Sequence, residues 1–190
     1  MFNESTMHSR QSGAVLVVSL LLLLVMTILA LSASQATRMQ ERMAGNSRDA
    51  DLAFQSAEAG LRNGERLIDD PALTSAPIPC STGRCRVFAL DVLPADLSAQ
   101  PEAWWNANAW SYAPDNTWNA TPGTALAGTG LARRDPQFVI EEVEEVTDSL
   151  TIPPTGPPPS RIYYRITSAA QGGTNTAQAV VQSTFARRFN

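Results

Sequence analysis

An uncharged apolar run over residues 14–33 constrains this chain more than any other feature of its sequence. Ser19, Thr27 and Ser32 are the only polar residues within the run. An α-helix of these 20 residues is about 30 Å long, which matches the hydrocarbon core of a bilayer. The run therefore predicts one membrane-spanning helix near the start of the chain.

Gly13 ends a short polar leader directly before this run. A residue without a side chain leaves the peptide bond accessible, so this position predicts cleavage between Gly13 and Ala14, before a helix that the mature protein keeps. A secretory signal peptide is the alternative, because Ser34 and Ala36 are small residues suited to a cut after the run. That alternative is disfavoured, since the run exceeds the usual apolar region of a signal peptide and the helical pattern continues past it.

Residues 34–70 continue the helical pattern, with a high density of good helix formers before Pro71. Apolar or small residues recur on one side of this predicted helix, at Met39, Met43, Ala50, Phe54, Ala57, Leu61, Gly64 and Ile68. The spacing predicts an amphipathic helix that extends the membrane span and packs on a protein core. Gly45 and Asn46 are its weakest point toward bending or local melting.

The segment over residues 71–134 is rich in Pro, Ala, Asn, Thr and Gly and predicts a long, partly irregular connection. Five aromatic residues are concentrated in this segment: Trp104, Trp105, Trp110, Tyr112 and Trp118. We favour the interpretation that these rings fill the core of a small head beneath irregular loops. A carbohydrate-binding or partner-binding surface is the alternative.

Three later segments, 137–146, 161–170 and 176–186, predict β-strands. The second alternates most clearly, with Ile162, Tyr164 and Ile166 on one face. Prolines between the first two segments predict an exposed loop, and glycines before the third predict a hairpin turn. The expected fold class is α+β, a long N-terminal helix packed on a small antiparallel sheet with long irregular loops.

These boundaries divide the chain into four parts. They are a leader (1–13), a transmembrane half of the helix (14–33), an amphipathic half of the helix (34–70) and a globular head with a C-terminal sheet (71–190).

Cys80 and Cys85 are separated by a turn-rich spacer and predict a disulfide in a domain outside the cytoplasm. A zinc site is the alternative, but it needs two further ligands, and the single histidine of the chain is His8 in the leader. Five residues offer side-chain oxygens at nearly alternating positions, as a calcium loop does: Asp115, Asn116, Thr117, Asn119 and Thr121. The glycine and the distant glutamate that a calcium loop requires are missing. We therefore expect no metal and no cofactor.

The composition disfavours nucleic-acid binding and catalysis. The net charge is −4, and the sequence has no basic cluster suited to a phosphate backbone. No histidine follows the leader, and neither a nucleophile elbow nor a phosphate-binding glycine loop is present. Four acidic residues, Glu141, Glu142, Glu144 and Glu145, predict a solvated or salt-bridging patch rather than a catalytic acid pair.

Several motifs in order along the chain are similar to those of one family. They are Gln-Ser-Gly-Ala-Val-Leu-Val-Val at 11–18, Glu-Arg-Met-Ala-Gly-Asn at 41–46, Ala-Glu-Ala-Gly-Leu-Arg at 57–62, Phe-Val-Ile-Glu at 138–141, and Gln-Ser-Thr-Phe at 182–185 with Arg187. On these motifs the chain resembles a type IV prepilin, specifically the PilX-type minor pilins, with both ends covered well and the middle poorly.

The resemblance implies a pilin-like fold and a specific processing route. Prepilin peptidase would cut between Gly13 and Ala14 on the cytoplasmic side and methylate the amine of Ala14. The implied partners are other minor pilins, the major pilin, the inner-membrane assembly platform and a large tip adhesin. The protein would be a single-pass inner-membrane protein with a periplasmic head, and part of the pilus at the cell surface after assembly. This orientation rests on the resemblance, because arginines lie on both sides of the span.

Val18 departs from the family pattern, because most pilins carry glutamate as the fifth mature residue. In the family that carboxylate pairs with the methylated amine of a neighbouring subunit. Its absence predicts that this subunit enters first, in a tip or priming complex that initiates assembly and supports twitching motility and adhesion. The alternative is that valine is tolerated at any position in the filament. A minor pseudopilin of type II secretion and a membrane-anchored, adhesin-like binding module remain alternative functions.

Overall fold

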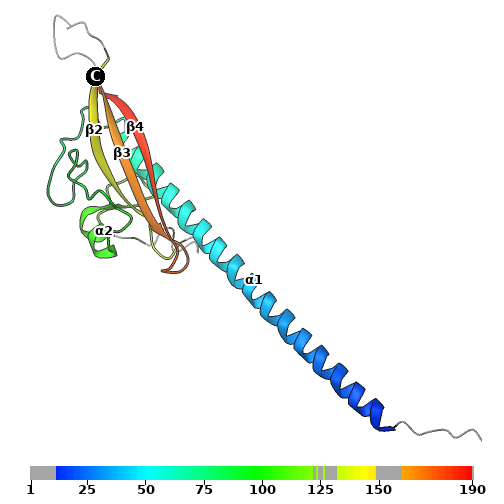
Figure 1. Ribbon diagram of the computed structural model, residues 1–190. Helices are drawn as coiled ribbons and strands as arrows, with labels where there is room; N and C mark the ends of the chain where they lie inside the picture. The colour runs from blue at the N-terminus through cyan, green and yellow to red at the C-terminus, as the bar shows by residue number, and fades with distance from the viewer. Residues whose placement is uncertain (1–11, 122, 124–125, 127–131, 149–159, 190) are drawn as a thin grey trace, which may run out of the picture. The chain divides into compact units, whose positions relative to one another are not determined.

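The structure, a computed structural model, describes residues 12–121, 123, 126, 132–148 and 160–189 (Figure 1). The elements are α1 (Ser12–Ile68), α2 (Glu102–Asn108), β1 (Trp110–Ser111), β2 (Gln137–Thr147), β3 (Ser160–Gln171) and β4 (Gln178–Phe189). They fall into two compact units, Met1–Gly45 and Asn46–Asn190. The predicted pilin-like α+β fold is confirmed: a long N-terminal apolar helix is followed by a four-stranded antiparallel sheet.

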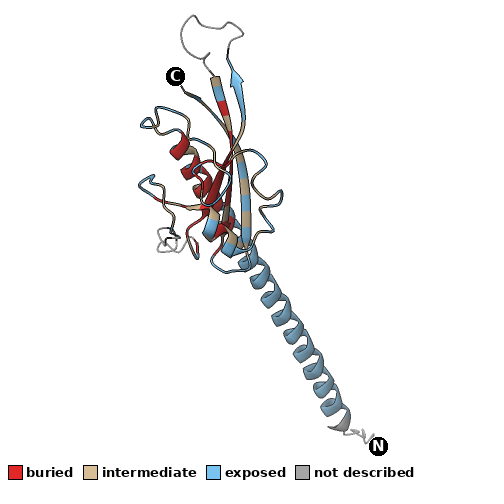
Figure 2. Cartoon of the chain, turned by 90° about the vertical axis from the view of Figure 1, so that its left-hand side faces the viewer, coloured by how far each residue is buried: buried red, intermediate tan, exposed pale blue. Residues whose placement is uncertain are grey.

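The first unit presents an apolar helical surface. One described helix, beginning at Ala14, is long and apolar enough to cross a membrane by its length and composition. Figure 2 colours this part of α1 as exposed. The hydroxyl of Ser19 donates to the carbonyl of Leu16 at 2.9 Å, and that of Thr27 donates to Leu24 at 2.8 Å. The hydroxyls of Ser19 and Thr27 are thus satisfied by the helix itself, which lowers the cost of placing them in lipid.

The second unit is built on a sheet with the strand order β1-β2-β3-β4, in which every neighbouring pair is antiparallel (Figure 1). The three predicted strands are present, and β4 begins two residues later and ends three residues later than expected, at Gln178 and Phe189. Strand β1 was not predicted, because two residues are too short to show a period. A β-bulge interrupts β2 between Glu142 and Glu144.

One face of the sheet packs on the part of α1 that belongs to the second unit. Leu61, Leu67 and Ile68 from the helix form one buried cluster with Phe138 and Tyr164 from the strands. In Figure 2 the buried residues lie where this helical segment and the sheet meet. Burying an apolar side chain of this size stabilises the fold by about 2 kcal/mol, so this cluster is the main support of the head.

The predicted helical stripe is wrong at four positions, of which Met39 and Met43 are two exposed side chains. Ala50 is exposed, and the ring of Phe54 is 52% exposed. The buried face instead begins at Ala53 and continues through Ala57 and Gly60. The small residues on this face allow the helix to lie close to the sheet, whereas a phenylalanine there would hold the two apart.

The opposite face of the sheet is covered by residues 80–109. Phe88 forms an isolated bridge with Glu141 and packs with Cys85, Trp105 and Val139 in a second buried cluster. The segment expected to be irregular therefore contains α2 and a bridge to β2. These pairings join residues far apart in the sequence, so a local pattern does not reveal them.

Candidate assembly interface

The predicted processing site lies at the beginning of α1. Gly13 and Ala14 both have helical backbone, and Ala14 is exposed. Val18 is exposed on the same helix, and it lines a shallow apolar hollow together with Ala14, Val15 and Leu22. No acidic residue lies within residues 14–33. The surface around Val18 therefore offers apolar contact and no carboxylate for an amine.

Cys80 and Cys85 form a disulfide. Cys85 is buried, and its carbonyl accepts a hydrogen bond of 2.6 Å from the indole Nε1 of Trp110. The guanidinium of Arg84, between the two cysteines, lies over the Trp110 ring with its carbon 5.8 Å from the ring centroid. The disulfide loop is thus fixed to the aromatic region of the head.

The aromatic residues of the head contact one another. Trp104 and Trp105 meet edge to face at 5.3 Å between ring centroids, and Trp110 and Trp118 do the same at 5.1 Å. Trp105 is buried, and the other three tryptophans are half-buried. This packing favours the interpretation that the rings fill the core beneath the loops.

The four glutamates of β2 lie in different environments. Glu141 is buried, and one of its carboxylate oxygens pairs with Arg165 on β3 at 3.0 Å. Its other oxygen accepts the backbone N–H of Asp91 at 3.1 Å. Burial, followed by the charge of Glu145, raises the pKa of Glu142 above its ordinary value. Glu141 is therefore a structural ion-pair partner, whereas Glu144 and Glu145 are exposed.

The oxygen-rich loop forms local turns. The carboxylate of Asp115 accepts the backbone N–H of Thr117 at 3.3 Å and its hydroxyl at 2.9 Å, and Asn119 accepts the N–H of Thr121 at 3.0 Å. Across the described ranges, no group of three or more His, Cys, Asp or Glu side chains is placed to hold a metal ion. These oxygens serve backbone turns.

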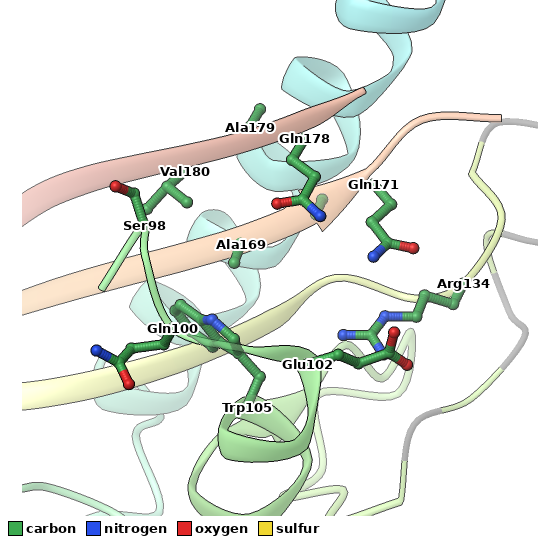
Figure 3. A pocket seen from close by; sticks show the side chains of 11 residues that line it. Ser98, Gln100, Glu102, Trp105, Arg134, Ala169, Gln171, Gln178, Ala179 and Val180 are labelled. Carbon is green, nitrogen blue, oxygen red and sulfur yellow. The ribbon is translucent and has the colours of Figure 1, made fainter. Parts of the chain in front are cut away.

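A small polar cavity lies between α2 and the start of the β3–β4 hairpin (Figure 3). Its volume is about 40 Å³, enough for a few water molecules and too small for an ordinary organic ligand. Arg134 pairs with Glu102 at its rim and donates to the side-chain oxygen of Gln137 at 2.6 Å. The cavity is therefore a packing gap with a mixed polar and apolar lining.

Comparison with known protein families gives two matches, which together span most of the chain. The family model "PilX N-terminal" matches residues 12–62, and the model "Type IV pilus assembly protein PilX C-term" matches residues 70–187.

The chain belongs to the PilX family.

Curated proteins and solved structures give no match to this PilX-family chain. Family membership makes the chain a minor pilin of the type IV pilus, and the family resemblance predicted from the sequence is confirmed. A PilX protein is a structural pilus component, which agrees with the expectation of a non-enzymatic chain that interacts with other pilus components. The apolar start of α1 is in keeping with a membrane anchor.

The structure of this PilX chain adds Gly60 and Asn63, which the sequence interpretation missed, and it confirms that Gly64 lies on the buried side of the helix, as predicted. Gly60 and Gly64 face the sheet so closely that an added Cβ would lie 2.4 Å from the Ser168 hydroxyl and 2.9 Å from a methyl of Ile166, respectively. Asn63 is fully buried between them and bonds the backbone of Ala113. The sequence did contain one indication of this role, because Asn63 is a polar residue on the same side of the helix as Gly60 and Gly64.

Proposed function

We propose that this minor pilin acts in a tip or priming complex that initiates pilus assembly, and that it thereby supports twitching motility and adhesion. The observation that carries the proposal is the apolar surface at Val18, where most pilins supply a carboxylate. A methylated N-terminal amine buried among apolar helices needs an opposite charge to offset its desolvation. A subunit without that carboxylate has no such pairing to offer to a subunit already incorporated, so it is suited to be the first one.

Processing by prepilin peptidase is part of this proposal. Cleavage between Gly13 and Ala14 would leave the apolar helix on the mature chain, and methylation would cap the new amine of Ala14. The head, residues 71–190, would then lie in the periplasm before assembly and on the pilus afterwards. Its partners would be other minor pilins, the major pilin, the assembly platform and a tip adhesin.

Mass spectrometry of the mature N-terminus tests the processing step. A methylated chain beginning at Ala14 supports the proposal, whereas a chain beginning at Gln35 or Thr37 contradicts it. The prediction is specific, because a signal-peptide cut would remove the whole apolar helix.

Deletion of the gene, followed by shearing of surface pili, tests the assembly role. We expect the loss of pili and of twitching, and restoration by the unsubstituted chain. Intact pili with a loss of protein secretion would contradict the proposal. Immunogold labelling tests the position: label at filament ends agrees with a tip complex, and label along the whole shaft contradicts it.

A Val18→Glu variant tests why the subunit would be confined to the filament tip. If the missing carboxylate confines the subunit to the tip, this variant should be found along the shaft, because it can pair with the amine of a preceding subunit. Val18→Leu is the matched control and should keep the original distribution. Equal labelling of the two variants would contradict the role assigned to Val18.

A further inference from the structure

The two edges of the sheet differ in how their backbone groups are used. On the outer side of β2, the N–H of Phe88 donates to Ile140 at 2.7 Å, and the N–H of Glu142 donates to Phe88 at 2.8 Å. Nearby, the N–H of Tyr112 donates to Pro136 at 2.9 Å, and β1 pairs with Phe138. This edge is therefore covered by other parts of the chain as far as Glu142, and beyond the bulge it carries the exposed charges of Glu144 and Glu145.

No described segment pairs with the outer side of β4, because β4 is the last strand in the sheet order and no backbone hydrogen bond from a described loop reaches it. The register with β3 shows which backbone groups of β4 point away from the sheet. The N–H of Gly172 donates to Ala177 at 3.0 Å, and bonded pairs then recur at every second residue of an antiparallel ladder. The odd-numbered residues of β4 therefore bond to β3. The even-numbered residues direct their N–H and C=O groups away from the sheet.

The same even-numbered residues have exposed side chains: Gln178, Val180, Gln182, Thr184, Ala186 and Arg188. The strand is 12 residues long, contains no proline or lysine, and pairs with β3 without a register shift. Proteins usually shorten, charge, bend or cover such an edge to prevent unwanted pairing. Only the arginines at the end of β4 provide any of these protections.

A groove runs beside this edge on the helical side of the sheet. It has a volume of about 500 Å³ and combines apolar side chains with charged ones of both signs, among them Leu61, Phe185, Glu58, Arg62 and Asp69. Phe185 belongs to β4, so a strand added next to β4 would direct alternate side chains into this groove.

We infer that the free edge of β4 accepts an extended segment of a different pilus subunit as a fifth strand, with an apolar side chain of that segment in the groove at Leu61 and Phe185. The inference rests on the proposed assembly with other subunits. Main-chain hydrogen bonds would supply the affinity, and the groove would supply the selectivity. Next to Val180, Gln182 and Thr184, small or β-branched residues of the partner fit best.

Two of the segments outside the described residues are unsuited to this place. Residues 149–159 contain five prolines, which lack the N–H group that a strand needs, and residues 1–13 are removed in the proposed processing. A second copy is disfavoured as well. Antiparallel pairing of two β4 strands would run the two α1 segments of the heads in opposite directions, whereas both chains are proposed to enter from one membrane. Parallel pairing of identical edges would not close.

Photocrosslinking in cells that assemble pili tests the inference on the full-length chain. A benzophenone amino acid placed at Thr184 should yield a covalent adduct with another pilus subunit, and the crosslinked peptide should be a proline-poor segment. Tyr163 is the control position, because it lies on the same face of the sheet one strand further from the edge, opposite Ala186. We expect little adduct there.

Gln182→Pro and Gln182→Ala form the decisive pair of variants in the Thr184 crosslinking strain. Both variants remove the glutamine side chain and its hydrogen bond to Thr167 on β3. Only proline also removes an outward N–H, and the backbone bonds between β3 and β4 are made by other residues. We expect Gln182→Pro to reduce the adduct about tenfold and Gln182→Ala to change it less than about twofold. Val180→Lys blocks the same edge with a charge and should also reduce the adduct, even if the proline variant folds poorly.

An adduct with a second copy, no adduct at Thr184, or an adduct unchanged by both Gln182→Pro and Val180→Lys would overturn the inference. Surface pili are measured in the same cells, so the two proposals can fail separately. If the chain without any edge substitution does not restore pili, the proposed function fails. If it restores pili and the adduct is insensitive to both edge variants, only the strand-pairing inference fails.

Discussion

The side-chain amide of Asn63 hydrogen-bonds the backbone of Ala113 through both of its polar atoms. Its Nδ2 donates to the Ala113 carbonyl at 3.0 Å, and the Ala113 N–H donates to its Oδ1 at 3.3 Å. Both residues are buried, and Ala113 lies just after β1. One side chain on α1 thus satisfies two backbone groups that belong to a non-helical segment, which ties this segment to the helix.

Replacing Asn63 with leucine should destabilise the head by about 3 kcal/mol, because the buried N–H and C=O of Ala113 lose their partners. Guanidinium denaturation in detergent, followed by tryptophan fluorescence, measures the change. Gln55→Leu, at an exposed position of the same helix, is the control and should change stability by less than about 0.5 kcal/mol. Equal denaturation midpoints for the two variants would contradict the role of Asn63.

Alanine at Gly64 should destabilise the head by roughly 1–3 kcal/mol, although alanine normally favours a helix. The added Cβ would lie 2.9 Å from a methyl of Ile166 and 3.0 Å from the Phe138 ring. Gly45→Ala is the matched control, because nothing lies within 4 Å of its added Cβ; there, helicity should increase. Circular dichroism during thermal unfolding separates the two effects, and a stabilising Gly64→Ala would show that the sheet can move away at little cost.

Asp49 should make the stability of the head depend on pH at the acidic end. The hydroxyl of Thr174, together with the backbone N–H groups of Thr174 and Gly173, holds the pKa of this carboxyl below its ordinary value. Its stabilising effect is therefore present above the ordinary pKa and is lost as the pH falls through the lowered one. Asp49→Ala should reduce the fall in melting temperature between about pH 7 and pH 3. Asp51→Ala, also exposed, should leave that fall unchanged.

Replacing both Cys80 and Cys85 with serine should lower the free energy of unfolding by about 2 kcal/mol, because the crosslink restricts the unfolded chain only over a short loop. The head should still fold, since the larger cluster between the helix and the sheet is unchanged and the second cluster keeps Phe88, Trp105 and Val139. Denaturation of the variant, compared with the parent protein under oxidising and reducing conditions, measures this effect. A reductant should weaken the parent and leave the variant unchanged; complete unfolding of the variant would instead make the disulfide essential to the fold.

The sequence predicted the elements that have a strong local period and missed those created by tertiary contact. The apolar helix follows from the length of its uncharged run, and the three long strands follow from side-chain alternation and the turn residues between them. Phe54 was misplaced because periodicity selects an apolar stripe without regard to size, whereas the sheet requires small residues next to it. Asn63 was missed because its partner, Ala113, lies 50 residues away along the chain. The processing site is a chemical inference from Gly13 and Ala14 that fold geometry does not address.

Odd-numbered and even-numbered residues of β4 are subject to different structural constraints. Odd positions bond to β3 and face the helix, so substitutions there are judged by the stability of the head. Apart from Gln182, whose side chain bonds Thr167, the even positions make neither contact, so they can vary while the head remains folded. A lineage of such proteins could therefore exchange one assembly partner for another through changes at alternate residues, with folding and partner choice evolving almost independently within the same dozen amino acids.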